Sequence, residues 1–190
     1  MVVVERSNMN RQDKFEKSKI TKASTNKVVC NVYYDAFGIE KVRFQNVTYN
    51  DKTSIDCYLD FEEVALLATD AASGRLIKEL EAGQKTISMG GTKHSKNYDG
   101  NPESRILSLG KSGDKIFINM SRGKGKLTET GAISPDGAPD LKISVGMTIE
   151  KFRSMMIFTN QAICGYLPHM VNSIVRQCEE DRKNANNTNN

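Results

Sequence analysis

The pattern that most constrains the fold is a change of hydrophobic period that occurs twice, each time after a run of short strands. Alternating residues over 54–60 give way at Asp60 to apolar positions spaced as on an amphipathic helix. The same change recurs at Thr148, after the strand-like segment 141–147. The two junctions share the order apolar, cap, apolar, Glu, charged, apolar. This predicts an α+β fold of antiparallel β-sheets with two main helices, built as a duplicated β…βα plan.

The segments that precede each junction are rich in β-branched and aromatic residues, as strands are. In the first half they are residues 28–34 and 41–49, joined by a turn at Asp35–Gly38. In the second half they are residues 85–91, 104–110, 114–122 and a less regular segment around 127–133.

The two helices have different expected ends. Asp60 is the expected N-cap of the first helix, which either breaks at Ser73-Gly74 or continues to Gly83. Thr148 is the expected cap of the second helix. Pro168 is expected to end or kink that helix, with a short helix over 169–178 following it.

The 190 residues suit one domain with polar ends. Residues 1–26 are interpreted as a flexible basic arm, residues 27–178 as a single α+β nucleic-acid-binding domain, and residues 179–190 as a disordered polar tail. The four cysteines form no CxxC pair, and the first residues lack a secretory signal. A reducing compartment is therefore expected, cytoplasmic or nucleoid-associated, and no membrane partner.

Positive charge is concentrated in one stretch. Residues 84–126 contain nine basic and three acidic side chains, whereas the whole chain carries a net charge of only +4. This stretch is also the strand-rich one and is interleaved with Tyr98 and Phe117. A basic sheet with interleaved aromatic rings is typical of surfaces that track a phosphate backbone and stack bases.

Strand alternation separates two faces over residues 114–122. Ile116, Ile118 and Met120 share one face, while Phe117 shares the other with Lys115 and polar residues. Phe117 is therefore the expected stacking platform, with Tyr98 as a second ring. The expected nucleic-acid-binding residues are Lys85, Lys93, Lys96, Tyr98, Arg105, Lys111, Lys115, Phe117, Arg122, Lys124 and Lys126.

The sequence shows no constellation typical of catalysis. His94 and His169 lack neighbours at metal-ligand spacing. Gly110-Lys111-Ser112 does not complete a phosphate-binding loop, because Arg105 occupies the position of the required first glycine. The chain is therefore expected not to be an enzyme, and no cofactor or metal is expected.

Four segments carry a resemblance to a known family. They are Gly113–Met120, the turn Pro135-Asp136-Gly137, the strand Leu141–Val145 and the helix opening Thr148–Phe152. Residues 113–167 resemble the single-stranded-DNA-binding core of the positive-cofactor-four coactivators, and the doubled plan resembles their Whirly relatives. The resemblance implies curved antiparallel sheets packed with helices, homo-oligomers and sequence-tolerant binding of single strands. The long insertion at residues 92–105 departs from the family pattern.

These observations favour a sequence-tolerant single-stranded DNA-binding protein that acts in DNA replication, recombination or transcription. Single-stranded nucleic acid and further copies of the chain are the expected partners. The alternatives are an RNA-binding protein, an OB-type barrel with the same ligand, and an oligomeric structural or interaction protein. In the last case the apolar helix 149–167, with Met155, Met156, Ile157 and Phe158, would be the interface.

Overall fold

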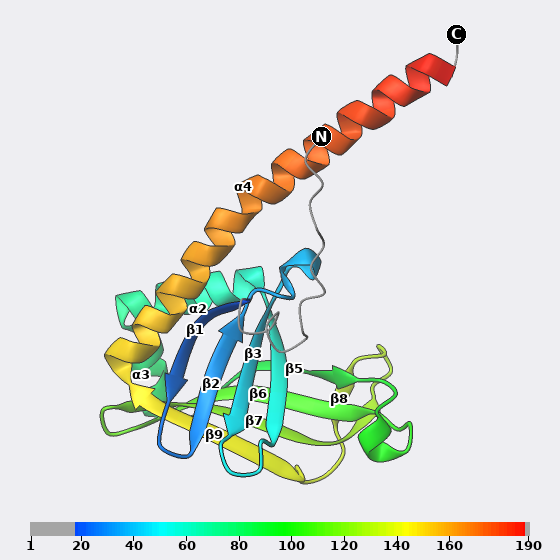
Figure 1. Ribbon diagram of the computed structural model, residues 1–190. Helices are drawn as coiled ribbons and strands as arrows, with labels where there is room; N and C mark the ends of the chain where they lie inside the picture. Colours follow the sequence, from blue (N-terminus) through cyan, green and yellow to red (C-terminus); the bar gives the residue numbers. More distant parts are fainter. Residues whose placement is uncertain (1–17, 189–190) are drawn as a thin grey trace.

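The computed structural model describes residues 18–188, with side chains described as far as residue 180. It is an α+β fold of antiparallel sheets, as the sequence predicts, with two sheets and three α-helices where the sequence predicts two main helices (Figure 1). The first half comprises β1 (Lys19–Ser24), β2 (Val28–Tyr33), the 3-10 helix η1 (Phe37–Ile39), β3 (Lys41–Thr48), β4 (Ser54–Asp60), α2 (Phe61–Ser73) and α3 (Arg75–Ala82). The second half comprises β5 (Lys85–Thr92), the 3-10 helix η2 (Lys96–Tyr98), β6 (Glu103–Ser112), β7 (Lys115–Leu127), β8 (Ile133–Pro135), β9 (Leu141–Thr148) and α4 (Ile149–Thr188).

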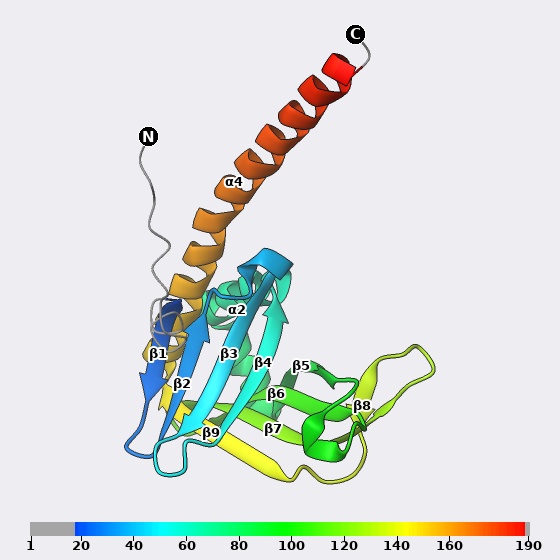
Figure 2. The same ribbon diagram turned by 45° about the vertical axis from the view of Figure 1, so that its right-hand side comes forward.

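The order of elements repeats in the two halves. The first sheet has the order β1-β2-β3-β4, and the main ladder of the second runs β5-β6-β7-β9. Short strand β8 pairs only with the end of β7. In both halves the last strand passes directly into a helix, at Asp60–Phe61 and at Thr148–Ile149. The strands of the two sheets run across one another, as Figure 1 and Figure 2 show.

Both junctions are capped as their sequences predict. Asp60 forms a capping box, in which its backbone N–H donates to the Glu63 carboxylate at 2.9 Å. The Thr148 hydroxyl accepts a hydrogen bond from the Lys151 N–H at 3.2 Å. Each cap satisfies a donor that the first helical turn leaves without an intrahelical partner. Gly74, at a φ of 81°, separates α2 from α3, so the chain both breaks there and remains helical nearly to Gly83.

The core lies between the inner faces of the two sheets and is closed by α2 and α4. Inward residues of the sheets are fully buried, among them Val42, Leu59, Ile116 and Val145. The helices add the following buried side chains: Val64, Leu67, Ala71, Phe152, Met155, Met156 and Ile163. The alternation predicted for residues 114–122 is confirmed, because Ile116, Ile118 and Met120 are buried.

One buried polar side chain joins the two sheets. Asn46 of β3 faces the core and donates from Nδ2 to the carbonyl oxygens of Ile118 at 3.0 Å and Ile143 at 3.1 Å. These carbonyls belong to β7 and β9. The amide therefore fixes how the first sheet sits on the second, which apolar contacts alone would leave less directional.

The structure differs from the sequence analysis in three places. Residues 19–24, assigned above to the flexible arm, form the edge strand β1, because their backbone pairs with β2 and Ala23 is buried. Residues 1–17 of that arm lie outside the described residues. The irregular strand expected around 127–133 is instead a turn at Thr128–Ala132, between the end of β7 at Leu127 and the start of β8 at Ile133.

The third difference is the C-terminal helix. Pro168 lies inside α4 and does not end it, so no separate helix begins at His169. The helix also continues through residues 179–188, where the sequence analysis places a disordered tail. A proline removes one backbone donor from a helix without removing the helical turns on either side. None of the helices that the structure describes is both long and apolar enough to cross a membrane.

Candidate nucleic-acid interface

Alternation along β7 places Phe117 on the outward face of the second sheet, the face turned away from the first sheet. Its three central strands align Gly110, Phe117 and Gly146 across the sheet. The outward positions of these strands are Ser104, Ile106, Ser108, Gly110, Ser112, Lys115, Phe117, Asn119, Ser121, Gly123, Lys142, Ser144, Gly146 and Thr148. Small and polar side chains dominate, and Phe117 is the only aromatic ring among them. Ser104, Ser108 and Gly123 are buried in spite of their outward parity, and Pro139 covers Gly123.

The Phe117 ring lies on the backbone of Gly146. A Cβ atom added at Gly146 would be 2.7 Å from Phe117 Cε1, a distance at which the two atoms overlap. The absent side chain therefore gives the ring its place, and the neighbouring strand covers the side of the ring that carries Cδ1 and Cε1. Cross-strand packing of an aromatic ring on a glycine holds that ring in a single orientation.

An open depression of about 580 Å³ lies beside the ring. Lys115, Phe117, Ser144 and Gly146 form its floor, and residues 25–28 of the β1–β2 turn form its other side. This turn brings Lys27 of the first sheet to the aromatic ring of the second. A planar group that enters the depression meets Phe117 and two ammonium groups, those of Lys27 and Lys115.

The charge of this face is positive and unpaired within the described part of the chain. Lys27, Lys115 and Lys142 are exposed, and none of them forms an ion pair with a described residue. The outward positions of β6, β7 and β9 include no aspartate or glutamate. The outer face of the first sheet differs, because Arg43 there is paired with Asp35 at 2.8 Å and Asp56 at 3.1 Å.

A row of hydrogen-bonding side chains crosses the same face. The Ser144 hydroxyl donates to Asn119 Oδ1 at 2.6 Å, and Ser108 stands opposite Asn119 on the other neighbouring strand. Gln84, just before β5, donates to the Ser108 hydroxyl. Ser108 is buried, so the half-buried Asn119 and the exposed Ser144 are the members of this row that offer hydrogen-bonding groups to a polar ligand.

Several of the basic residues predicted from the sequence are ion-paired elsewhere. Lys85 contacts Glu79 at 2.5 Å and Lys111 contacts Glu81 at 3.2 Å, both beside α3. Lys124 is 3.6 Å from Asp136 beyond the end of the main ladder. Each of these lysines has a carboxylate as its nearest partner, so its charge is partly neutralised.

The insertion at residues 92–105 is organised by one buried carboxylate. Glu103 is fully buried and accepts hydrogen bonds from Ser95 at 2.8 Å, Asn97 at 2.7 Å and Arg105 at 2.6 Å. The Tyr98 hydroxyl donates to Asp140 at 2.7 Å. Arg105 and Tyr98 therefore anchor this loop, and their predicted binding groups are engaged within the protein.

The remaining predicted residues lie apart from Phe117. Arg122 belongs by strand alternation to the inward face of β7, at the end of the core. Its Nε is buried without a described hydrogen-bond partner. Lys93 and Lys96 are exposed in the insertion, and Lys126 is exposed beside β8. Of the eleven predicted residues, the structure places only Lys115 and Phe117 on the outward face near one another.

Two lysines of this face were not predicted. Lys142 stands in the strand-like segment 141–147, whose alternation groups it with Ser144 and Gly146, so the sequence held a usable signal. The sequence offers no such signal for Lys27. This residue lies in a turn of the other sheet and reaches the face only through the packing of the two sheets.

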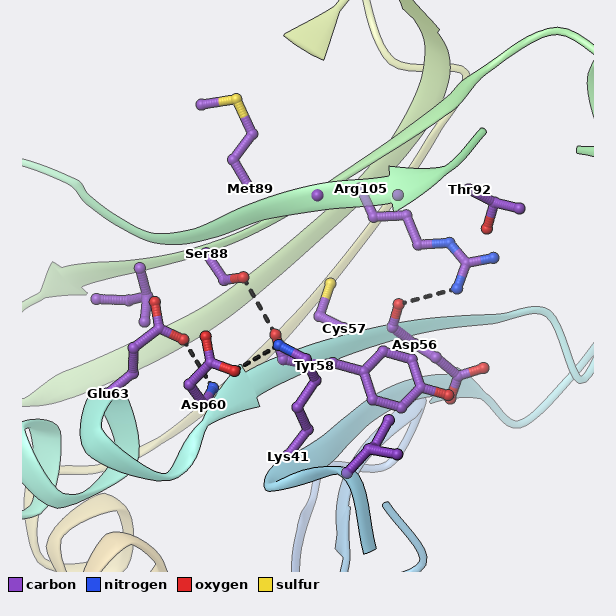
Figure 3. Close-up of a pocket in the computed structure, with 14 residues that line it drawn as sticks. Lys41, Asp56, Cys57, Tyr58, Asp60, Glu63, Ser88, Met89, Thr92 and Arg105 are labelled. Atoms are coloured by element: carbon purple, nitrogen blue, oxygen red, sulfur yellow. Dashed lines mark hydrogen bonds and ion pairs between the residues drawn. The ribbon is translucent and has the colours of Figure 1, made fainter. Parts of the chain in front are cut away.

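A second cavity, of about 490 Å³, separates the edge strands β4 and β5 (Figure 3). Side chains of the second sheet bridge it to β4: the Ser88 hydroxyl donates to the Tyr58 carbonyl at 3.2 Å, and Arg105 donates to the Asp56 carbonyl at 3.3 Å. Its lining holds three carboxylates and two basic groups, so it does not attract a polyanion.

The charged side chains that line this cavity have structural roles. Asp60 and Glu63 form the cap of α2, and Lys41 is ion-paired with Asp60. Burial raises the pKa of the Cys57 thiol to about 12, which leaves it a poor nucleophile. The described residues contain no cluster of three or more His, Cys, Asp or Glu side chains arranged to hold a metal ion.

Comparison of the chain with protein-family models, with curated proteins and with solved structures gave no match.

Proposed function

We propose that the protein binds single-stranded nucleic acid on the outward face of β6, β7 and β9, tolerant of sequence and with DNA favoured over RNA. It would coat exposed strands in replication, recombination or transcription. The observation that carries the proposal is that Phe117 shares its face with lysines that form no ion pair with a described residue. The outward positions of the same strands include no carboxylate. The other predicted basic residues whose contacts are described are mostly held by carboxylates, and this face is the exception.

The geometry supports a division of roles on this face. A base stacks on the open side of the Phe117 ring, whose other side rests on Gly146. Lys27, Lys115 and Lys142 neutralise phosphates on either side of that base. Asn119 and Ser144 hydrogen-bond to base edges or sugars. Stacking accepts any base, which accounts for tolerance of sequence.

The proposal retains the resemblance of residues 113–167 to the positive-cofactor-four and Whirly-like proteins. Two features support it: the repeated order of sheet and helix, and the direct passage of β9 into α4. The proposal also retains the expectation that the chain forms homo-oligomers.

The test is fluorescence anisotropy of a labelled mixed-sequence oligonucleotide of about 30 nucleotides, titrated with the full chain across a salt series. Single-stranded DNA, single-stranded RNA and duplex DNA form the three arms. The variant Lys115→Gln/Lys142→Gln removes two charges from the proposed face. Lys85→Gln/Lys111→Gln removes two charges beside α3 and is the matched control.

We expect the Lys115→Gln/Lys142→Gln variant to lower single-strand affinity about tenfold or more and to reduce the salt slope by roughly 1.4, at about 0.7 per phosphate contact. The control variant should bind within about twofold of the unmodified chain. Phe117→Leu should lower affinity by roughly 5- to 100-fold through lost stacking. Equal losses in both double variants would reject the face, and no binding at low salt would reject the function.

A further inference from the structure

The C-terminal half of α4 projects from the body of the protein (Figures 1 and 2). Its last aromatic contact with the body is Tyr166, whose ring centroid is 5.1 Å from that of Phe37 and 6.3 Å from that of Phe61. Beyond it, every residue from 171 to 180 is exposed. Large apolar side chains are among them, with Val171 53% and Ile174 54% exposed.

Most of the exposed apolar residues of α4 belong to a row of regular spacing that also includes Asn160. Alternate steps of three and four residues connect Ile157, Asn160, Cys164, Leu167, Val171, Ile174 and Cys178. The pattern covers three heptads, with Ile157, Cys164, Val171 and Cys178 at one core position and Asn160, Leu167 and Ile174 at the other. Each of the seven is exposed or half-buried. We call this row the α4 seam. Spacing of this kind is the signature of a coiled coil.

The α4 seam is separate from the surface by which α4 packs on its own sheets. That packing uses Phe152, Met155, Met156, Thr159 and Ile163, all of them buried. The interface suggested from the sequence therefore changes, because Met155 and Met156 belong to the core of the domain and only Ile157 and Phe158 remain exposed.

The helix around the seam lacks the features that stabilise a solitary helix in water. Residues 154–175 contain no aspartate, glutamate, lysine or arginine, so no ion pairs support this part of the helix. Gly165 and Pro168 both weaken it, as do the β-branched Val171, Ile174 and Val175. A helix of this composition gains its stability from burying an apolar face against a partner.

We propose that α4 pairs with α4 of a second copy of this chain in a parallel, in-register coiled coil along the α4 seam. Two copies of the seam can pack against each other, because the row carries no charge and the side chains of one copy fit between those of the other. Asn160 favours the parallel, in-register pairing, in which its amide meets the same amide of the partner copy and finds a hydrogen-bond partner. At about 1.5 Å per residue the seam is ~33 Å long. The proposal does not depend on the nucleic-acid function.

The first test is the mass of the full chain in solution by sedimentation equilibrium over a concentration series. The expected mass is twice the chain mass of 21.2 kDa. Leu167→Lys/Ile174→Lys places two charges in the seam and should give the single-chain mass. Ser173→Lys/Glu180→Lys has the same seven-residue separation on the opposite side of the helix and should remain a dimer. A monomeric unmodified chain, or a dimer that the seam variant leaves intact, would overturn the proposal.

The second test reads the register and needs no disruptive substitution. In a parallel coil Cys178 faces the same residue of the partner copy, within reach of a disulfide. In a Cys164→Ser background, a mild oxidant should link two chains through Cys178. The control Cys164→Ser/Cys178→Ser/Ser173→Cys moves the thiol off the seam and should not link. A dimer without the Cys178 link, or with an equal link in the control, would exclude the parallel register.

Discussion

Phe117 and Gly146 face one another across neighbouring strands, and the ring of the first occupies the space that a side chain on the second would fill. The glycine thus determines how the aromatic ring is presented at the surface. Gly110, on the opposite side of Phe117 in the same row, differs. A Cβ atom there would meet only Asn119 Nδ2, at 3.4 Å.

This difference predicts unequal effects of two alanine substitutions. Gly146→Ala should displace the Phe117 ring and lower single-strand affinity by roughly fivefold or more, because the stacking platform loses its orientation. Gly110→Ala should change affinity by less than about twofold, since it leaves the ring in place. Anisotropy titrations of both variants make the measurement, with circular dichroism to confirm folding. Equal effects would show that the ring is not a platform.

The amide of Asn46 predicts a strong asymmetry between two nearly isosteric substitutions. Asn46→Leu loses two hydrogen bonds but also removes an amide oxygen that is buried without a described partner, so we expect a loss of about 1–3 kcal/mol in the free energy of unfolding. Asn46→Asp places a carboxylate against the carbonyls of Ile118 and Ile143 and should cost about 3–5 kcal/mol at pH 7.

The pH dependence separates these two cases. Burial raises the pKa of the introduced carboxyl in the folded state, so the folded protein binds its proton more tightly than the unfolded chain does. The deficit of Asn46→Asp should therefore shrink as the pH falls toward 4, where the carboxyl protonates and donates again. The deficit of Asn46→Leu should not shrink. Urea unfolding at pH 7 and pH 4 provides the comparison.

Glu103 predicts the acid behaviour of the insertion. Burial alone would raise its pKa, but hydrogen bonds from Asn97, Ser95 and Arg105 outweigh burial, and the pKa lies below its ordinary value of 4.5. A lowered folded-state pKa stabilises the protein above the ordinary value, and this stabilisation is lost as the pH falls through the folded-state pKa. The protection factors of the amides of residues 95–101, which compare the measured exchange rate with that of an unfolded chain at the same pH, should therefore fall at acidic pH before those of the core do.

The matching substitution is Glu103→Gln, which we expect to lower the free energy of unfolding at pH 7 by roughly 1–3 kcal/mol. Glu129→Gln, at an exposed position without an ion pair to a described residue, is the control and should be neutral. The difference between Glu103→Gln and the unmodified chain should narrow in acid. A constant difference from pH 7 to pH 3 would show that the Glu103 charge contributes nothing.

The buried thiols predict a reactivity test. Burial raises the pKa of both Cys30 and Cys57 to about 12, so almost no thiolate exists at pH 8. In a Cys164→Ser/Cys178→Ser variant, a chromogenic disulfide reagent should remain uncoloured until denaturant unfolds the chain. It should then report two thiols. Reaction of the folded variant within minutes would show that the first sheet opens locally.

Local sequence patterns predicted much of the fold. The alternation of Ile116, Phe117 and Ile118, and the caps at Asp60 and Thr148, depend on neighbours within a few residues. Such neighbours decide element type and which face is buried. Pro168 shows the limit of this reasoning, because a helix continues through a proline when the turns on both sides remain favourable.

The candidate site was less predictable. Sequence alone located the basic stretch 84–126 and the face of Phe117, but it did not show which lysines find carboxylate partners. Lys85 and Lys111 are paired because α3 folds back beside them. Arg105 is held by the carboxylate that organises its own loop.

The sequence by itself determined the two sheet-and-helix units, their order and the polarity of each strand face, since hydrophobic period and capping are local properties. Only the tertiary structure decided which charges remain free. It also brought Lys27 from the first sheet to Phe117 of the second and left the side chains of the α4 seam exposed or half-buried. The physical reason is that ion pairing and burial depend on distances between residues far apart in the chain, which no local pattern encodes.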